Sequence, residues 1–94
     1  MAIYTVLINK NEDYVLEKIE NQYEKKDFHV TEDGYIFLSD TGLTKEVGKK
    51  IGLLDYEGPE DRQPAGLIIK QEHVTGYYYE SFWEWMNSLK DDSV

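Results

Sequence analysis

The chain has 94 residues, a net charge of −9 and no cysteine. Its length allows one domain with a small core, and the lack of cysteine excludes thiol catalysis, disulfides and cysteine-ligated metal sites. An acidic surface repels nucleic-acid backbones and anionic lipids, so we expect no direct nucleic-acid partner and no membrane partner.

The first part of the chain changes from a strand-like to a helix-like pattern. Residues 3–8 form an almost continuous apolar, β-rich run, which is typical of a central strand. From residue 12 to about residue 26 the apolar positions take the spacing of an amphipathic helix. These positions are Val15, Leu16, Ile19 and Tyr23.

A hairpin and a second helix are predicted next. Residues 28–31 and 35–38 are β-rich runs that flank Asp33-Gly34, and glycine tolerates the positive φ that tight hairpin turns need. Residues 43–54 then repeat apolar side chains at helical spacing, which predicts a second helix. The one stretch of the chain with a net positive charge lies on this helix and contains Lys45, Lys49 and Lys50.

The C-terminal part of the chain predicts a loop, a strand and a last helix. Residues 55–66 contain two prolines and form the longest loop, and residues 66–74 read as a fourth strand. Residues 80–90 predict a helix whose apolar face holds Phe82, Trp85, Met86 and Leu89. We expect residues 91–94 to be a frayed tail.

This order of elements predicts an α+β fold. Two strand–helix units around a hairpin give a ferredoxin-like β-α-β-β-α-β arrangement with a single antiparallel sheet, here with an extra C-terminal helix. Residues 1–90 would form this one domain. Both faces of the first strand are apolar, so either the C-terminal helix or a second copy of the chain is expected to cover the second face.

The order and spacing of several segments also resemble a known group of proteins. Asn9-Lys10-Asn11, Gly34-Tyr35-Ile36-Phe37, Gly66-Leu67-Ile68-Ile69 and Trp83-Glu84-Trp85 resemble the SinR-like and CRISPR-adaptation-associated small endonuclease families. The resemblance implies a ferredoxin-like fold and a homodimer. In the endonuclease-like members an aspartate near the end of the first strand holds a divalent cation, whereas here that stretch ends in Asn9. The departure puts metal-dependent nuclease activity in doubt.

No catalytic constellation is evident among the titratable side chains. His29 and His73 lie on predicted strands without a zinc-type partner nearby in sequence. A role for either histidine as a general base stays open, although half-exposed strand histidines are more often without a role. We therefore predict no catalytic residues, no metal and no cofactor.

The first helix carries a row of acidic residues. Their spacing of four, three and four residues places them along one flank of the predicted helix, and such like charges repel each other slightly. They are Asp13, Glu17, Glu20 and Glu24. The row either is an ordinary solvated flank or imitates a line of phosphates. Asp33 and the loop residues Glu57, Glu60 and Asp61 would extend it if they lie nearby.

An aromatic cluster is the second candidate surface. Residues 77–85 include six aromatic side chains. Strand and helix geometry turn Tyr78 and Trp83 away from their aromatic neighbours. Exposed tyrosine and tryptophan are favoured anchors of protein interfaces, so we expect these two to bind a partner. Base stacking and a wide core are the alternatives.

Together these patterns suggest a binding protein. We expect a non-enzymatic, acidic module whose partner is a protein with a basic surface. The specific hypothesis is an inhibitor that mimics nucleic acid and occupies the basic cleft of a nucleic-acid-binding enzyme, as phage anti-CRISPR and other anti-defence proteins do. The alternatives are a divalent-metal-dependent nuclease and a structural homodimer without a ligand.

The sequence also predicts a location. The apolar run at the N-terminus is too short for a secretory leader or a membrane span. We therefore expect the chain in the cytoplasm, which would be the host cytoplasm if the source is viral.

Overall fold

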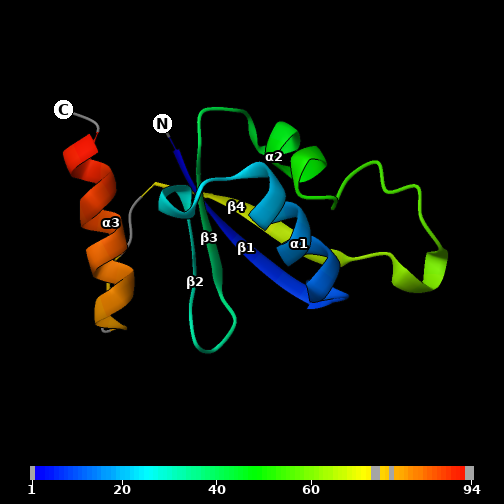
Figure 1. Ribbon diagram of the computed structural model, residues 1–94, viewed down its shortest axis with the longest axis horizontal. Helices are drawn as coiled ribbons and strands as arrows, with labels where there is room; N and C mark the ends of the chain where they lie inside the picture. The colour runs from blue at the N-terminus through cyan, green and yellow to red at the C-terminus, as the bar shows by residue number, and fades with distance from the viewer. Residues whose placement is uncertain (1, 73–74, 77, 93–94) are drawn as a thin grey trace.

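The computed structural model describes residues 2–72, 75–76 and 78–92, with residues 90–92 described by their backbone alone. The helices and strands follow the predicted order along the chain (Figure 1). Their bounds are β1 Ala2–Lys10, α1 Glu12–Gln22, β2 Phe28–Val30, β3 Ile36–Asp40, α2 Thr44–Lys50, β4 Ala65–Gln71 and α3 Glu80–Asp92. Two short 3₁₀ turns, η1 Lys25–Asp27 and η2 Glu60–Arg62, lie between them.

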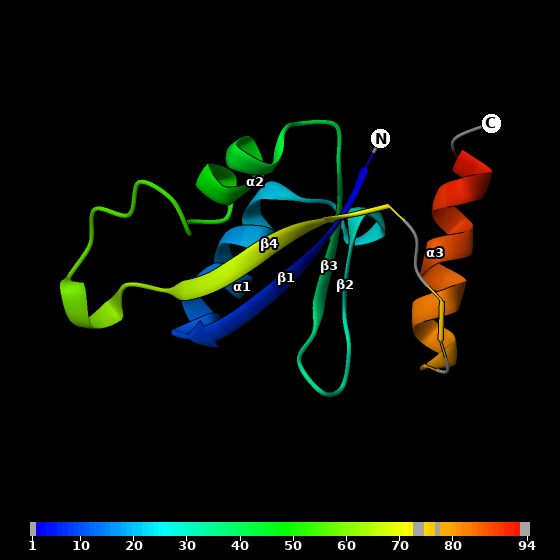
Figure 2. The same cartoon turned by 180° about the vertical axis from the view of Figure 1, so that it is seen from behind.

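The described strands form a single four-stranded sheet in the order β2-β3-β1-β4, with antiparallel pairing throughout. This is the ferredoxin-like arrangement, so the predicted fold class is confirmed. Figures 1 and 2 show α1 and α2 together on one side of the sheet, while α3 stands apart from them, beyond β2. The helices therefore cover different parts of the sheet.

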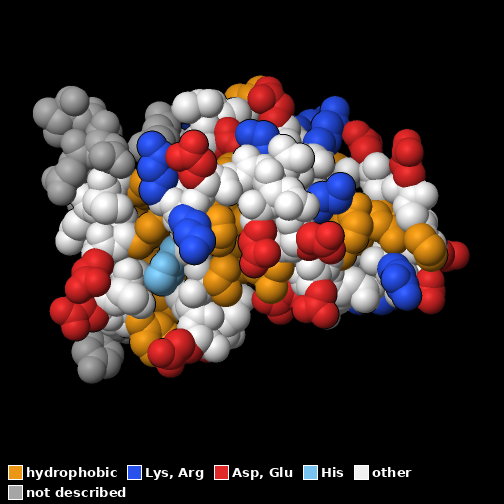
Figure 3. All heavy atoms as spheres, viewed as in Figure 1, with side chains coloured by type: hydrophobic (Ala, Val, Ile, Leu, Met, Phe, Trp, Pro, Cys, Tyr) orange, Lys and Arg blue, Asp and Glu red, His pale blue; other side chains and the backbone are white. Residues whose placement is uncertain are grey.

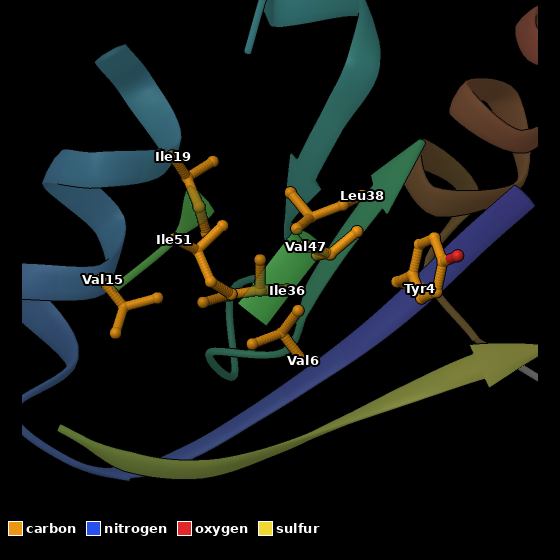
Figure 4. Packing of buried hydrophobic residues seen from close by; sticks show 8 residues of the cluster. All are labelled: Tyr4, Val6, Val15, Ile19, Ile36, Leu38, Val47 and Ile51. Atoms are coloured by element: carbon orange, nitrogen blue, oxygen red, sulfur yellow. The ribbon is translucent and has the colours of Figure 1, made fainter. Parts of the chain in front are cut away.

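The main core lies between the sheet and the first two helices. In the β1–β3 register Tyr4 pairs with Leu38 and Val6 with Ile36, so these four side chains share one face of the sheet. Figure 4 shows them meeting side chains from α1 and α2. The core consists of Tyr4, Val6, Val15, Ile19, Ile36, Leu38, Val47 and Ile51, each at most 1% exposed. Burying each such side chain contributes roughly 1.5–3 kcal/mol.

A second core forms where α3 packs against the other face of the sheet. Phe37 points to this face because it alternates with Ile36 and Leu38 along β3. Its ring lies 4.5 Å from that of Phe82, and the indole Nε1–H of Trp85 donates a hydrogen bond to the carbonyl of Lys26 at 3.0 Å. Met86 and Leu89 complete the cluster. The C-terminal helix thus covers the β2–β3 part of the second face.

The β4 part of that face remains open. Leu67 pairs with Leu7, and Ile69 with Thr5, on the same side of the sheet as Phe37. Leu67 is 66% exposed and Ile69 is 48% exposed. An apolar strip on an edge strand is therefore accessible beside α3.

Helix α1 ends earlier than predicted. Tyr23 has extended backbone angles, φ −125° and ψ 146°, and its hydroxyl donates a hydrogen bond to Asp40 Oδ2 at 2.6 Å. This contact with β3 draws the chain out of the helix after Gln22. The prediction of a helix to about residue 26 is wrong at this end, and Glu24 lies outside the helix. The acidic row on α1 therefore has three members, Asp13, Glu17 and Glu20.

Helix α2 is also shorter than the predicted span of residues 43–54. Gly52 adopts φ +87°. The N–H of Leu53 donates a hydrogen bond to the carbonyl of Gly48, and the N–H of Gly52 donates one to the carbonyl of Lys49. This pattern is the Schellman motif, which ends helices at a left-handed glycine. A Cβ at Gly52 would lie 2.5 Å from the Tyr14 ring, so the turn also needs glycine for close packing.

The last two elements differ in length from the prediction. Strand β4 ends at Gln71, and the predicted end at Val74 lies outside the described residues. Helix α3 continues to Asp92, two residues beyond its predicted end. Among the described residues, no helix combines the length and the apolar character needed to cross a lipid bilayer.

Two candidate binding grooves

The first candidate site is a groove of about 680 Å³ between the start of α1 and the loop that precedes β4. We call it the acidic groove. Its acidic members are Asp13 and Glu17 from α1 and Asp55 and Glu57 from the loop. The other lining residues are Asn11, Tyr14, Tyr56, Gly58, Pro59 and Arg62.

Local contacts hold the two walls of the acidic groove together. Asn11 takes left-handed backbone angles at the junction of β1 and α1, and its Nδ2 donates to the carbonyls of Asp61 and Gln63 at 3.3 and 3.0 Å. The rings of Tyr14 and Tyr56 meet edge to face with centroids 5.3 Å apart. The loop is thereby placed against the helix.

The acidic groove brings together only some of the predicted binding residues. Asp13, Glu17 and Glu57 line it, so the helical row and the loop do form one surface. Glu20 is exposed on α1 but does not line the groove, and Glu24 lies outside the helix. Glu60 and Asp61 are exposed on η2, beside the groove lining.

The electrostatics of the acidic groove favour positively charged ligands. Four carboxylates and one guanidinium line it, and charges of one sign in a concave surface concentrate the local potential. Lys49 Nζ lies 3.8 Å from Asp55 Oδ2, a solvent-exposed pair that contributes little stability. Figure 3 shows acidic and basic side chains interspersed over the face that α1 and α2 form. The groove is thus more one-sided in charge than its surroundings.

The second candidate site lies between α3 and the β2–β3 turn. This groove of about 770 Å³, which we call the aromatic groove, is lined by Asp33, Gly76, Tyr78, Tyr79, Glu80 and Trp83. A neighbouring hollow of about 420 Å³ shares Tyr78 and Trp83 and continues over Leu7 and Tyr35 on the open face of the sheet. Asp33, predicted as an extension of the acidic row, does not line the acidic groove. It meets Tyr78 and Trp83, which were predicted together as the aromatic surface.

Hydrogen bonds fix the acidic side of the aromatic groove. Asp33 Oδ1 accepts bonds from Thr31 Oγ1 at 2.6 Å and from the Tyr78 hydroxyl at 3.0 Å. These bonds, chiefly the one from Thr31, hold the pKa of the Asp33 carboxyl below its usual value. Burial and the nearby Asp33 carboxylate raise the pKa of Tyr78. Asp33 is therefore a carboxylate, and Tyr78 a neutral phenol, near neutral pH.

Tyr78 and Trp83 serve both the core and the groove. Each is half-buried, and their ring centroids lie 5.3 and 4.9 Å from that of Phe82. Tyr79 is 40% exposed and meets Tyr78 edge to face at 4.9 Å. The predicted interface anchors are thus partly built into the second core rather than fully exposed.

The remaining candidates from the sequence have other surroundings. His29 stacks on Trp85 at 5.9 Å, burial lowers its pKa, and its Nε2 has no hydrogen-bond partner among the described residues. His73 lies outside the described residues. Lys50 Nζ contacts Asp40 Oδ2 at 3.0 Å and lies over the Tyr23 ring. In residues 2–72, 75–76 and 78–92, no three histidine or acidic side chains form a group that could hold a metal ion.

The sequence contained part of the signal for these grooves. Charge spacing on the first helix predicts Asp13 and Glu17, and the acidic loop predicts Glu57 only if the loop lies nearby. The groove residues Tyr14, Asp55, Tyr56 and Arg62 are not among the predicted binding residues. Nothing in the local sequence marks them, because their role depends on where the loop docks. Comparisons with protein-family models, curated proteins and solved structures find no match to this chain.

Proposed function

We propose that the chain is a non-enzymatic module that binds a basic segment of a protein partner in the acidic groove. The observation that carries this proposal is the convergence of Asp13 and Glu17 with Asp55 and Glu57 in one concave surface. Lysine and arginine side chains would replace water around these carboxylates, and Tyr14 and Tyr56 would contact their aliphatic stems. The charge of −9 adds long-range attraction to such a partner.

A narrower form of the proposal is an inhibitor that occupies the nucleic-acid cleft of an enzyme. The row Asp13, Glu17 and Glu20 places one charge about every 4.5–6 Å along the axis of α1. Duplex DNA carries one charge per about 3.4 Å of each strand. The row alone is therefore too sparse, and the carboxylates of Asp55 and Glu57 would supply the additional charges that the mimicry needs.

The first experiment measures binding of a fluorescent oligo-lysine peptide by anisotropy. Reversing three charges of the groove, Asp13→Lys, Glu17→Lys and Glu57→Lys, should weaken binding about tenfold or more, because each lost contact is a charge-assisted one. The matched control reverses three exposed acids outside the groove, Glu32→Lys, Glu46→Lys and Glu84→Lys. Equal losses in the two variants would show that net charge alone attracts the peptide, and would refute a specific groove.

A test of the inhibitor hypothesis requires the natural partner of the chain. A tagged chain would capture proteins from the host, and the captured protein would then be tested for nucleic-acid binding with and without the added chain. We expect the chain to displace the nucleic acid, and the groove variant to fail in this. A captured partner that binds nucleic acid and the chain at the same time would contradict the inhibitor hypothesis.

A homodimer through β4 is a second candidate function. It is favoured by the exposure of Leu67 and Ile69 on an edge strand, whose outer backbone groups can pair with a further strand. Two antiparallel copies of β4 would extend the sheet and bring the open strips of the two copies side by side on one face. The net charge of each copy opposes this association.

A further inference from the structure

We propose that the aromatic groove binds an organic cation, an alkylated ammonium or a guanidinium group. Three aromatic side chains and two carboxylates line it: Tyr78, Tyr79, Trp83, Asp33 and Glu80. The faces of aromatic rings attract cations, and cages of such rings are suited to alkylammonium groups that shed water readily. This site is separate from the acidic groove, and its proposed ligand is a single cationic group rather than a basic segment.

The carboxylates set the sign of the ligand charge. Asp33 stays ionised because Thr31 and Tyr78 donate hydrogen bonds to it, and both donors contact Oδ1. Its Oδ2 receives no hydrogen bond from the described residues, so that oxygen is available to a cation. Glu80, in the first turn of α3, supplies the second acidic side chain of the lining. An anionic ligand, such as a nucleotide stacked on the rings, would be repelled.

The lining also distinguishes an organic cation from a metal ion. A hard cation such as Mg²⁺ or Ca²⁺ takes six or more oxygen ligands, whereas half of the described lining consists of aromatic side chains. An alkylammonium or guanidinium group can contact ring faces and carboxylates together. The chemistry of the lining therefore fits a group that is both charged and weakly hydrated.

The aromatic groove is held in shape before any ligand arrives. Tyr78 is fixed by its bond to Asp33 and by packing on Phe82, and Trp83 packs on the same ring. Phe82 is itself 1% exposed within the second core. Side chains that are already ordered lose little entropy on binding, which favours small ligands.

The test is a titration of the ¹⁵N-labelled chain followed by NMR. Choline is the probe for a free alkylammonium compound, and blocked amides of trimethyllysine and arginine are the probes for a side chain of a protein. We expect saturable shifts of the Trp83 indole N–H at millimolar concentrations of at least one cation. The neutral isostere of choline, 3,3-dimethylbutan-1-ol, should bind about tenfold more weakly, since it lacks the charge.

Variants locate the binding without removing the rings. The double variant Asp33→Asn, Glu80→Gln should raise the dissociation constant about tenfold or more, since each change removes a full negative charge from the lining. Glu84→Gln is the matched control on the same helix, because Glu84 is exposed and does not line the groove. Its dissociation constant should equal that of the unchanged chain.

Three outcomes would overturn the inference. They are the absence of a saturable shift with any of the cations, equal affinity for choline and its neutral isostere, and shifts centred on Tyr14 and Tyr56 in the acidic groove. The first two have no bearing on binding of oligo-lysine by the acidic groove, and the third would agree with it. Loss of oligo-lysine binding in the groove variant likewise leaves the choline titration unaffected, so the two proposals fail separately.

Discussion

Asp40 joins β3 to α1 and α2 through a cluster of hydrogen bonds. Its side chain is 8% exposed and accepts bonds from the Tyr23 hydroxyl, the Gly42 N–H and Lys50 Nζ at 2.6, 2.7 and 3.0 Å. Burial alone would raise the pKa of this carboxyl, but the three donors outweigh burial and hold the pKa below its usual value of 3.8. The folded state therefore prefers the ionised form.

This preference predicts a pH dependence of stability. A carboxyl whose pKa is lowered by folding adds stability above the unfolded pKa of 3.8, and this part is lost as the pH falls through the lower folded pKa. Asp40→Asn should lower the free energy of unfolding by about 1.5–3 kcal/mol at pH 7. Urea unfolding should show the difference shrinking below pH 4. A difference that is constant with pH would contradict the role of the charge.

Gly52 gives a second prediction at the scale of one residue. Its φ of +87° and the 2.5 Å approach of the Tyr14 ring leave no room for a side chain. Gly52→Ala should lower the free energy of unfolding by at least about 1–2 kcal/mol, because of the left-handed backbone alone. Thermal unfolding measures this loss, and a variant as stable as the unchanged chain would show that the α2 terminus is assigned wrongly.

At the scale of the elements, the sequence predicts helices and strands well but not where helices end. The type and order of all seven main elements follow from periodicity, and Asp33-Gly34 marks the hairpin, where Gly34 has φ +90°. The ends of α1 and α2 depend on Tyr23 meeting Asp40 and on Gly52 meeting Tyr14. These partners are distant in sequence, so local patterns do not reveal them.

The acidic groove illustrates the same limit. Charge spacing identifies Asp13 and Glu17, but only the docking of the loop by Asn11 adds Asp55 and Glu57. The aromatic groove likewise depends on the bond between Tyr78 and Asp33, which joins α3's N-terminal side to the hairpin. When two segments that are distant in sequence form a surface, local patterns identify candidate residues within a segment but not the contact that brings the segments together.

The hydrogen bonds by which Asn11 holds the loop against α1, which we call the tether, can be tested directly. Asn11→Gly keeps the left-handed backbone accessible but removes the bonds to the carbonyls of Asp61 and Gln63. Hydrogen exchange of residues 55–63 should become faster, and oligo-lysine binding should weaken. Asn21→Gly, a change at an exposed site on α1, is the control and should leave exchange in the loop as it was. Unchanged loop exchange in Asn11→Gly would contradict the tether.

At the scale of the whole molecule, α3 is part of the fold rather than an appendage. Phe82 is 1% exposed and contacts Phe37, Tyr78 and Trp83. Phe82→Ala should lower the free energy of unfolding by about 3–5 kcal/mol, as do other large core truncations. Denaturant unfolding should remain a single transition. Unfolding of α3 alone, while the rest of the chain stays folded, would mean that α3 is a separate unit.

The open strip on β4 makes the oligomeric state informative. If two copies pair through β4, sedimentation should give the mass of a dimer, and Ile69→Lys should give a monomer because the exposed strip becomes charged. A dimer that persists in Ile69→Lys would refute pairing at this strip. A monomeric unchanged chain at high concentration would refute the homodimer altogether.

The central claim is that a basic protein segment binds in the acidic groove, and NMR mapping of the oligo-lysine peptide tests it most directly. The account predicts that the largest amide shifts occur at Asp13, Glu17, Asp55 and Glu57. These shifts should vanish in the variant Asp13→Lys, Glu17→Lys, Glu57→Lys. The largest shifts should be the same in the Asp33→Asn, Glu80→Gln variant. Shifts spread evenly over all exposed acids, or centred on the aromatic groove, would contradict the account.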